Sequence, residues 1–161
     1  MKTVALSEVA EVFNGKTPRK AEQRTSGHPV LKIKDLNALG EFRGSFESFV
    51  DPALAAKHRV KWARSGDTVI LNAAHNVSHV ASKTALLQTN VEGSLLTGEW
   101  LVVRSGDSAD ARYVHYWLTR PAVRAALKEV VKGIHLYPRD VAALQIPLPP
   151  LAEQRRIAAI L

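Results

Sequence analysis

LQIPLPPLAEQRRIAAIL, the stretch from Leu144 to Leu161, organises the rest of the chain around it. After a short apolar run, Pro149-Pro150 hold the backbone extended, because each proline ring fixes φ and restricts the residue before it. The strong helix formers that follow predict a helix with Ile157, Ile160 and Leu161 on one apolar face. No Gly, Asn or Pro closes this helix, which indicates that its apolar face packs on a partner or continues in a further segment.

The composition bounds the class of protein. A chain of 161 residues fits one domain, and a hydrophobic fraction of 46% is enough for a buried core. No apolar run approaches the about 18 residues that a membrane helix needs, and no secretory signal follows Met1. The absence of cysteine excludes disulfides and Cys-type zinc sites. These features are compatible with a cytoplasmic protein that has no membrane partner.

Basic residues are in excess and are unevenly placed. Lys and Arg number 22 against 15 Asp and Glu, a net charge of +7. The stretch from Lys16 to Lys34 holds a single acid, Glu22, and the stretch from Lys57 to Arg64 holds none. This clustering suggests a polyanionic partner, nucleic acid ahead of membrane, and the equally weighted alternative is a generally basic soluble protein.

Local patterns predict an α+β fold: a mixed, partly antiparallel sheet with flanking short helices and a C-terminal helix that extends away from the domain. Ser7 is expected to cap a helix over Glu8–Phe13, and Asp51-Pro52 is expected to start another that runs to about His58. Strands are expected at Pro29–Leu36, Phe46–Val50, Val60–Trp62, Asp67–Leu71, Lys83–Gln88 and Glu99–Arg104. Further helices are expected at Ala109–Leu118, after Pro121 and at Val141–Leu144, before a short strand that ends at Pro147.

Two polar loops carry candidate ligand contacts. In the loop Asn72–Ser82, five side chains could contact DNA bases: Asn72, His75, Asn76, Ser78 and His79. The alternative is a loop whose Asn and Ser side chains cap its own backbone. His75 and His79 also have the spacing of two ligands on a helix, but no third ligand accompanies them, so no metal site is predicted.

Candidate phosphate contacts come from the loop Lys16–His28 and from the helix after Pro121. They are Lys16, Arg19, Lys20, Arg24, Arg124 and Lys128. On the helix the basic residues recur every four positions, which fits either a phosphate track or a solvent-exposed basic face. No phosphate-binding loop, serine elbow or adenine-methyltransferase motif is present, so the sequence predicts no catalytic residues and no cofactor of its own.

Four stretches together resemble the target-recognition half of a type I restriction–modification specificity subunit. They are Leu6–Val12 with Asn14-Gly15-Lys16-Thr17-Pro18, Pro29–Leu36, Gly66–Leu71, and Gly133–Tyr137 with the closing Leu144–Gln154. The closing stretch is the most specific of the four. The resemblance implies that residues 1–147 form a DNA target-recognition domain and that residues 148–161 form a proline hinge and the start of a conserved spacer or dimerisation helix.

The resemblance also implies a role. Such a subunit is non-catalytic and binds double-stranded DNA, methyltransferase (M) subunits and a restriction (R) subunit, while S-adenosylmethionine, ATP and Mg belong to those partners. The chain has one recognition domain where a full subunit has two, which predicts a fragment, a truncated frame or a half-subunit that pairs, in one form as a homodimer through the C-terminal helix.

Three hypotheses follow. In the first, the chain is a sequence-specific DNA recognition module whose binding weakens with salt. In the second, it is an interaction protein that docks on a methyltransferase-like partner or on its own copy through Ile157, Ile160 and Leu161, without binding DNA. In the third, which the missing motifs disfavour, it is a small hydrolase or nuclease that depends on a histidine.

Overall fold

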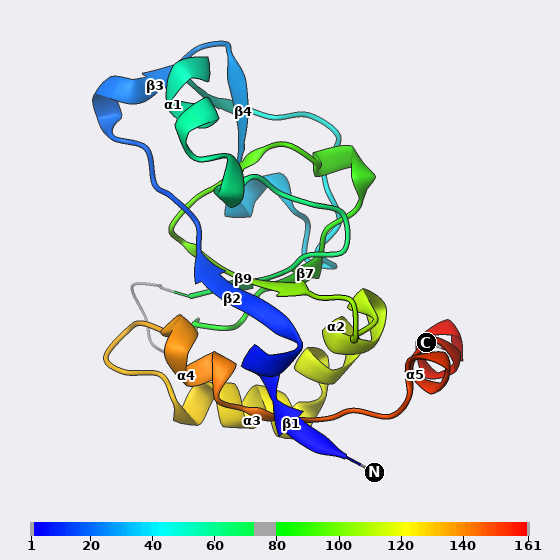
Figure 1. Ribbon diagram of the computed structural model, residues 1–161. Helices are drawn as coiled ribbons and strands as arrows, with labels where there is room; N and C mark the ends of the chain where they lie inside the picture. The colour runs from blue at the N-terminus through cyan, green and yellow to red at the C-terminus, as the bar shows by residue number, and fades with distance from the viewer. Residues whose placement is uncertain (1, 73–79, 161) are drawn as a thin grey trace.

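The fold is layered around one antiparallel sheet (Figure 1). The computed structural model describes residues 2–72 and 80–160. Its central sheet has the order β2 (Ala10–Asn14), β9 (Trp100–Ser105), β6 (Thr68–Leu71) and β7 (Thr84–Leu86), all antiparallel. Every residue of β6 and five of the six in β9 are buried, because both faces of the sheet are covered.

A smaller sheet lies above the central one in Figure 1. Its strands are β3 (Gln23–Arg24), β5 (Ser48–Val50), β4 (His28–Leu31) and β8 (Leu95–Leu96), in that order. The pair β4–β8 is parallel and the others are antiparallel, which confirms the predicted mixed, partly antiparallel topology. Short helices flank it: α1 (Pro52–Lys57) and the 3₁₀ turns η2 (Lys20–Glu22), η3 (Ile33–Asp35), η4 (Arg59–Lys61) and η6 (Thr89–Val91).

Helices cover the other face of the central sheet. They are α2 (Ala111–Thr119), α3 (Pro121–Glu129) and α4 (Pro138–Ala142), and they lie beneath the sheet in Figure 1. The main core lies in this layer, where Ile70 and Leu101 of the sheet meet Trp117 and Leu118 of α2. Near the two ends of the chain, β1 (Thr3–Ala5) and β10 (Gln145–Pro147) pair with each other in a separate two-stranded antiparallel sheet. None of the helices within residues 2–72 and 80–160 is long and apolar enough to cross a membrane.

The predicted helix over Glu8–Phe13 is wrong. The chain instead makes a 3₁₀ turn, η1 (Leu6–Glu8), followed by strand β2, whose Val12 and Phe13 pair with Val103 and Val102 of β9. The spacing of apolar residues alone allowed a helix. Pairing with β9 instead buries the same apolar side chains and also gives the backbone its hydrogen bonds. The predicted strand Val60–Trp62 is likewise the 3₁₀ turn η4, with one isolated bridge from Trp62 to Leu95.

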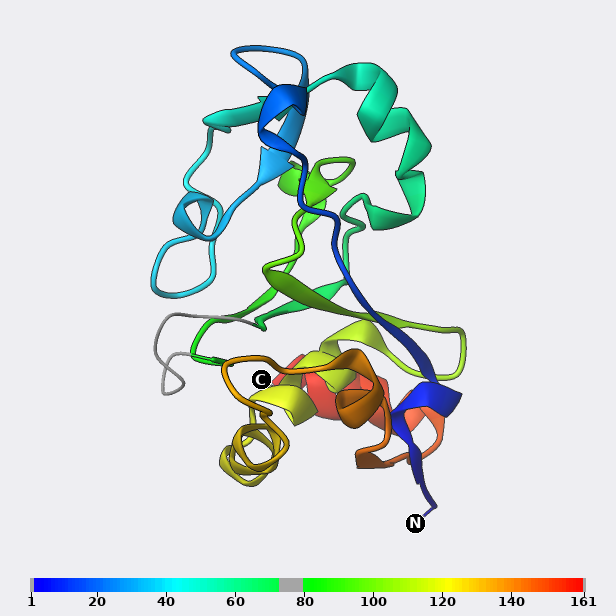
Figure 2. The same cartoon turned by 90° about the vertical axis from the view of Figure 1, so that its left-hand side faces the viewer.

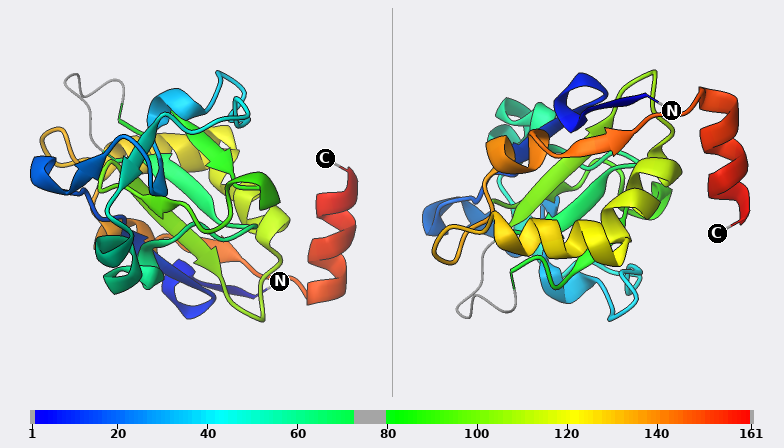
Figure 3. Two further views of the ribbon diagram at one scale, coloured as in Figure 1. Left: turned by 90° about the horizontal axis from the view of Figure 1, so that it is seen from above. Right: turned by 90° about the horizontal axis from the view of Figure 1, so that it is seen from below.

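The C-terminal helix α5 (Leu151–Ile160) does not extend freely away from the domain. It lies at one side of the molecule, beside α2, in both views of Figure 3. Gln154 is fully buried at this contact: its Oε1 accepts from Asp110 N at 2.8 Å, and its Nε2 donates to Pro149 O at 2.9 Å. Arg112 Nη2 donates to Ala158 O at 3.0 Å, so α5 is held along its length.

Candidate nucleic-acid interface

Loops from three strands meet at one edge of the central sheet, the edge that faces the viewer in Figure 2. The chain leaving β2 crosses the β8–β9 turn, where Lys16 N donates to Leu96 O at 2.8 Å and Gly98 N donates to Thr17 Oγ1 at 2.9 Å. A Cβ on Gly15 would lie 2.1 Å from Thr97 O, so only glycine allows this crossing. The basic loop that starts at Lys16 is therefore fixed at its base.

Asn72 joins the loops at this edge through hydrogen bonds. Its Nδ2 donates to Asn14 Oδ1 at 2.9 Å and to Gly98 O at 3.0 Å. Its backbone N donates to Glu99 O, and its backbone O accepts from Leu136 N at 2.8 Å. The residue is 3% exposed, and its hydrogen bonds join its own loop to three other segments, so its side chain is not presented to a base as its residue type predicted. The other predicted base contacts, His75, Asn76, Ser78 and His79, lie outside the described residues.

The segment between α3 and α4 projects as a rigid turn. Lys132 and His135 exchange backbone hydrogen bonds of 2.9 and 3.1 Å around Gly133, whose φ is +62°. Leu136 is buried and anchors the turn, whereas Ile134 and Tyr137 are 42% and 46% exposed. The ring centroids of His135 and Tyr137 are 6.0 Å apart. The exposed rings of this turn were not predicted from the sequence, where Gly133 and Pro138 were the available signal of a turn.

A hollow of about 240 Å³ lies between these segments. Its lining includes Asn14, Thr17, Asn72, Glu99, His135 and Tyr137. Side chains far apart in the sequence are thus brought to one place. These six side chains can donate or accept hydrogen bonds, and Gly98 and Leu136 complete the lining.

The basic loop itself carries four of the predicted phosphate contacts. Lys16, Arg19, Lys20 and Arg24 are all exposed. Arg19 Nε lies 3.3 Å from Glu22 Oε1, and the Arg19 backbone N–H holds the pKa of that carboxyl below its usual value. Pairs of this exposed kind contribute little to stability, so these cations can exchange partners for phosphates.

The neighbouring stretch around η4 adds preorganised cations. The Arg59 guanidinium lies 5.2 Å from the centre of the Trp62 ring, which also stacks on His28 at 4.6 Å. Lys61 Nζ donates to Asn14 O at 2.7 Å, and burial, followed by the charge of Arg104, lowers the pKa of Lys61. Arg59 is exposed and held on an aromatic face, an arrangement that suits contact with an anion.

The remaining predicted site residues lie elsewhere. Arg124 and Lys128 are exposed on α3, at the opposite end of the molecule from β3 in Figure 1, so the two predicted phosphate sets are not brought together. On α5, Ile157 is half-buried against the core and Ile160 is 84% exposed. Leu161 lies outside the described residues.

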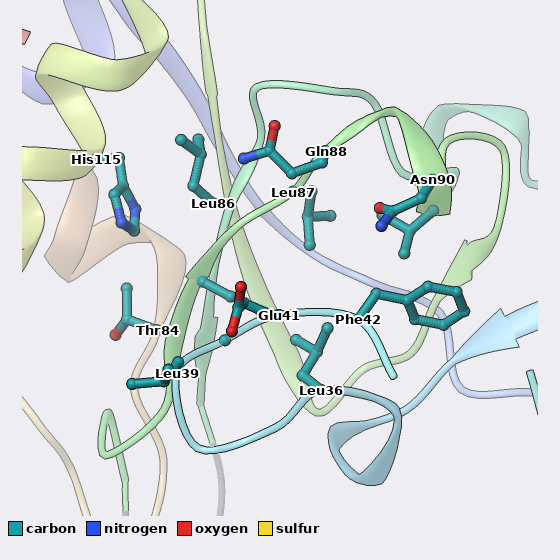
Figure 4. Close-up of a pocket in the computed structure, with 13 residues that line it drawn as sticks. Leu36, Leu39, Glu41, Phe42, Thr84, Leu86, Leu87, Gln88, Asn90 and His115 are labelled. Atoms are coloured by element: carbon teal, nitrogen blue, oxygen red, sulfur yellow. The ribbon is translucent and has the colours of Figure 1, made fainter. Parts of the chain in front are cut away.

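A larger hollow of about 480 Å³ lies between β7 and the turn that carries Leu39 and Glu41 (Figure 4). His115 Nδ1 is 3.1 Å from Thr68 Oγ1, and burial lowers the pKa of His115. Thr68 is only 1% exposed, so its hydroxyl is not accessible for attack on a substrate. The part of the chain that the structure describes holds no group of three or more metal-ligating side chains.

Comparisons with known proteins bear on this geometry. A profile of the type I restriction modification DNA specificity domain matches residues 1–161. No curated protein sequence matches the chain. Among solved structures, a chain from a type I R-M system, described for its complex assembly and conformational transition, is similar at 23% identity and a TM-score of 0.70.

Two further structures have the same fold. The HsdS subunit from Thermoanaerobacter tengcongensis is 22% identical with a TM-score of 0.69, and a type I S subunit from M. genitalium is 10% identical with a TM-score of 0.54. The first two alignments cover 99% of this chain and 36% of those chains, and the third covers 99% and 37%. The chain therefore spans little more than a third of the length of each.

Proposed function

Because the chain belongs to the family of type I restriction modification DNA specificity domains, we propose that it is a sequence-specific double-stranded DNA recognition module of a type I restriction–modification complex. In this proposal residues 1–147 bind the target, and residues 148–161 form the hinge and the spacer helix. The module itself is non-catalytic. Methyl transfer and cleavage, with their S-adenosylmethionine, ATP and Mg, belong to partner M and R subunits in the cytoplasm.

The observation that carries the proposal is the loop edge in Figure 2. The loop with the exposed cations begins at Lys16 and Thr17, at a hollow whose lining includes polar side chains, and its base is held by backbone hydrogen bonds. Phosphate contacts supply affinity and register on DNA, while polar side chains in the hollow supply contacts to base edges. We assign the phosphates to Lys16, Arg19, Lys20 and Arg24, and the bases to the loop after Asn72 together with the turn between α3 and α4.

Salt titration tests the phosphate contacts. If the four loop cations each neutralise one phosphate, the logarithm of the binding constant falls with the logarithm of salt at a slope of about −3.6. Affinity for a duplex would then drop about 150-fold between about 50 and 200 mM salt, measured by fluorescence anisotropy. Binding that is indifferent to salt contradicts the proposal.

A matched pair of variants locates the contact. R19Q/K20Q should make the slope shallower by about 1.8, because two counterion-releasing contacts are lost. R155Q/R156Q removes the same charge from exposed positions on α5, on the far side of the molecule, and should leave the slope unchanged. R124Q/K128Q tests α3 as a second, separate phosphate contact. Equal effects from all three double variants would indicate only a general charge effect.

A second function is favoured by the exposure of Ile160, 84% at the end of α5. Here the chain is a half-subunit that docks on an M subunit, or on its own copy, through the apolar positions Ile157, Ile160 and Leu161. Sedimentation equilibrium of the whole chain should show a dimer that I160E disrupts, with A152E as the control on the same helix. A measured mass equal to one chain at all concentrations would contradict the homodimer, and docking on an M subunit would then be the remaining form of this second function.

A further inference from the structure

We propose that the hollow lined by Glu99, His135 and Tyr137 receives the exocyclic amino group of one cytosine or adenine, with the Glu99 carboxylate as its acceptor. This inference rests on the proposed DNA recognition and names the base chemistry that one site would select. It makes Glu99 a specificity-determining residue and Asn72 its positioning residue.

The first argument is the hydrogen-bond character of the hollow. Glu99 is exposed and forms no ion pair with the described residues, so its carboxylate offers free acceptor positions. Asn72 takes no part in this contact, because its Nδ2 donates to Gly98 O and its Oδ1 is buried beneath the surface. A carboxylate with unused acceptor positions selects a ligand that donates.

The second argument is the sign of the charge. Glu99 is an acid in the hollow that also includes Thr17, where the basic loop begins, in a chain of net charge +7. A carboxylate near DNA repels phosphates and lowers general affinity, so its position there excludes a phosphate as the ligand of this hollow. Acidic side chains contact bases by accepting from the amino group of cytosine N4, and adenine N6 offers the same donor. Repulsion of other groups then becomes part of the selectivity.

The third argument is size and rigidity. A volume of about 240 Å³ equals about eight water molecules at about 30 Å³ each, enough for the edge of one base. His135 and Tyr137 form a wall of two rings on a turn that is pinned by the hydrogen bond from Leu136 N to Asn72 O. Aromatic side chains of this kind provide flat contact area at a small cost in conformational entropy.

The backbone of Asn72 also sets the position of Glu99. Its backbone O accepts from Asn72 N at 2.9 Å, at the start of the fully buried Trp100. The acceptor and the aromatic wall are thus both fixed through the Asn72 backbone, one on each side. The site is preorganised, which is what discrimination between bases requires.

The test uses the whole chain and a pool of randomised 30-base-pair duplexes. Bound duplexes are selected with wild-type protein, with E99A, which removes the acceptor, and with E41A as a control that removes the same charge at the other hollow, where Figure 4 shows Glu41. Wild type and E41A should enrich the same sequence. E99A should lose the preference at one position, with a change of about 5- to 150-fold in discrimination there. Its melting temperature should stay that of wild type, because the side chain is exposed.

Base analogues then identify the donor. In the enriched duplex, purine replaces adenine, or 2-pyrimidinone replaces cytosine, one position at a time, so that a single amino group is removed. Wild type should lose about tenfold or more at one position, and E99A should lose nothing there. The position that responds shows which of the two bases supplies the amino group.

The outcomes separate this inference from the function on which it rests. An E99A preference identical to that of wild type, or no effect of any amino deletion, overturns the inference and leaves DNA recognition intact. A wild-type pool with no enriched sequence overturns both. E99A should also bind unrelated duplexes as well as wild type does, or better, since a repelling charge is lost. Weaker binding to all duplexes would mark Glu99 as structural and overturn the inference.

Discussion

The buried ion pair between Asp67 and Arg104 is predicted to hold the two sheets of the domain together. Arg104 on β9 forms two parallel hydrogen bonds to Asp67, Nε to Oδ1 at 2.9 Å and Nη2 to Oδ2 at 2.8 Å. The side chains are only 8% and 2% exposed. Arg104 also donates to the backbone oxygens of Val60 and Trp62, at 3.3 and 2.8 Å. It therefore ties the central sheet to the segment around η4, whose Trp62 forms a bridge to Leu95 of the small sheet.

The perturbation is Arg104→Met, which keeps the length of the side chain and removes its charge. Asp67 would then be a buried carboxylate whose remaining hydrogen bond is from Arg64 N at 2.9 Å. Removing one partner of a buried pair costs about 3–5 kcal/mol, because the other charge is left uncompensated. For a domain of this size the melting temperature should fall by about 6 to 20 °C.

Urea unfolding followed by circular dichroism measures the effect. The control is Lys34→Met, which breaks the exposed pair with Glu47 at 3.0 Å and should cost about 1 kcal/mol or less. The double variant Asp67→Leu/Arg104→Met should be less destabilised than Arg104→Met, since no lone charge remains. If Arg104→Met loses no more than the Lys34 control, the reasoning about the ion pair fails.

Three further predictions concern the framework. Gly15→Ala places a Cβ 2.1 Å from Thr97 O and should cost about 1–3 kcal/mol or more by urea unfolding, whereas Gly106→Ala, with its nearest atom at 3.3 Å, should cost less; equal costs would contradict the close approach. Asn72→Ala removes the bonds to Asn14 and Gly98 and should cost about 1–3 kcal/mol, and an unchanged unfolding midpoint would show that the edge does not need them. Burial lowers the pKa of His115, so below about pH 6.5 the unfolded chain binds more protons than the folded chain, and the free energy of unfolding should fall as the pH drops. The variant His115→Gln should make this pH dependence flatter. An equal slope in both proteins would exclude His115 as its cause.

The sequence predicted most elements whose signal is local. The helix after Asp51-Pro52 is α1, and Asp51 caps it by accepting from Ala53 N at 3.0 Å. The runs Asp67–Leu71 and Glu99–Arg104 became β6 and β9, because continuous apolar residues fit a doubly covered sheet. Residues 8–13 were predicted wrongly, since the choice between helix and strand there depends on the partner strand β9, more than 80 residues away in the sequence.

The candidate site was harder to predict for the same reason. Residue type suggested Asn72 as a base contact, but its side chain is occupied by Asn14, 58 residues away, and by Gly98. Glu99 looked like the start of a strand, and His135 and Tyr137 looked like part of a closing signature. Their meeting around one hollow arises from tertiary contacts that no local pattern encodes.

The loop edge separates the residues that hold the structure from those that contact DNA in the proposed function. Its base is joined largely through backbone groups, as in the hydrogen bonds from Lys16 N to Leu96 O and from Leu136 N to Asn72 O. Backbone bonds do not depend on the identity of the side chains at the loop tips. Exposed residues such as Glu99 and Tyr137 could therefore be exchanged with little effect on the free energy of unfolding, while the contacts they offer to DNA would change. A recognition module needs this arrangement, since its target can then vary on a constant framework.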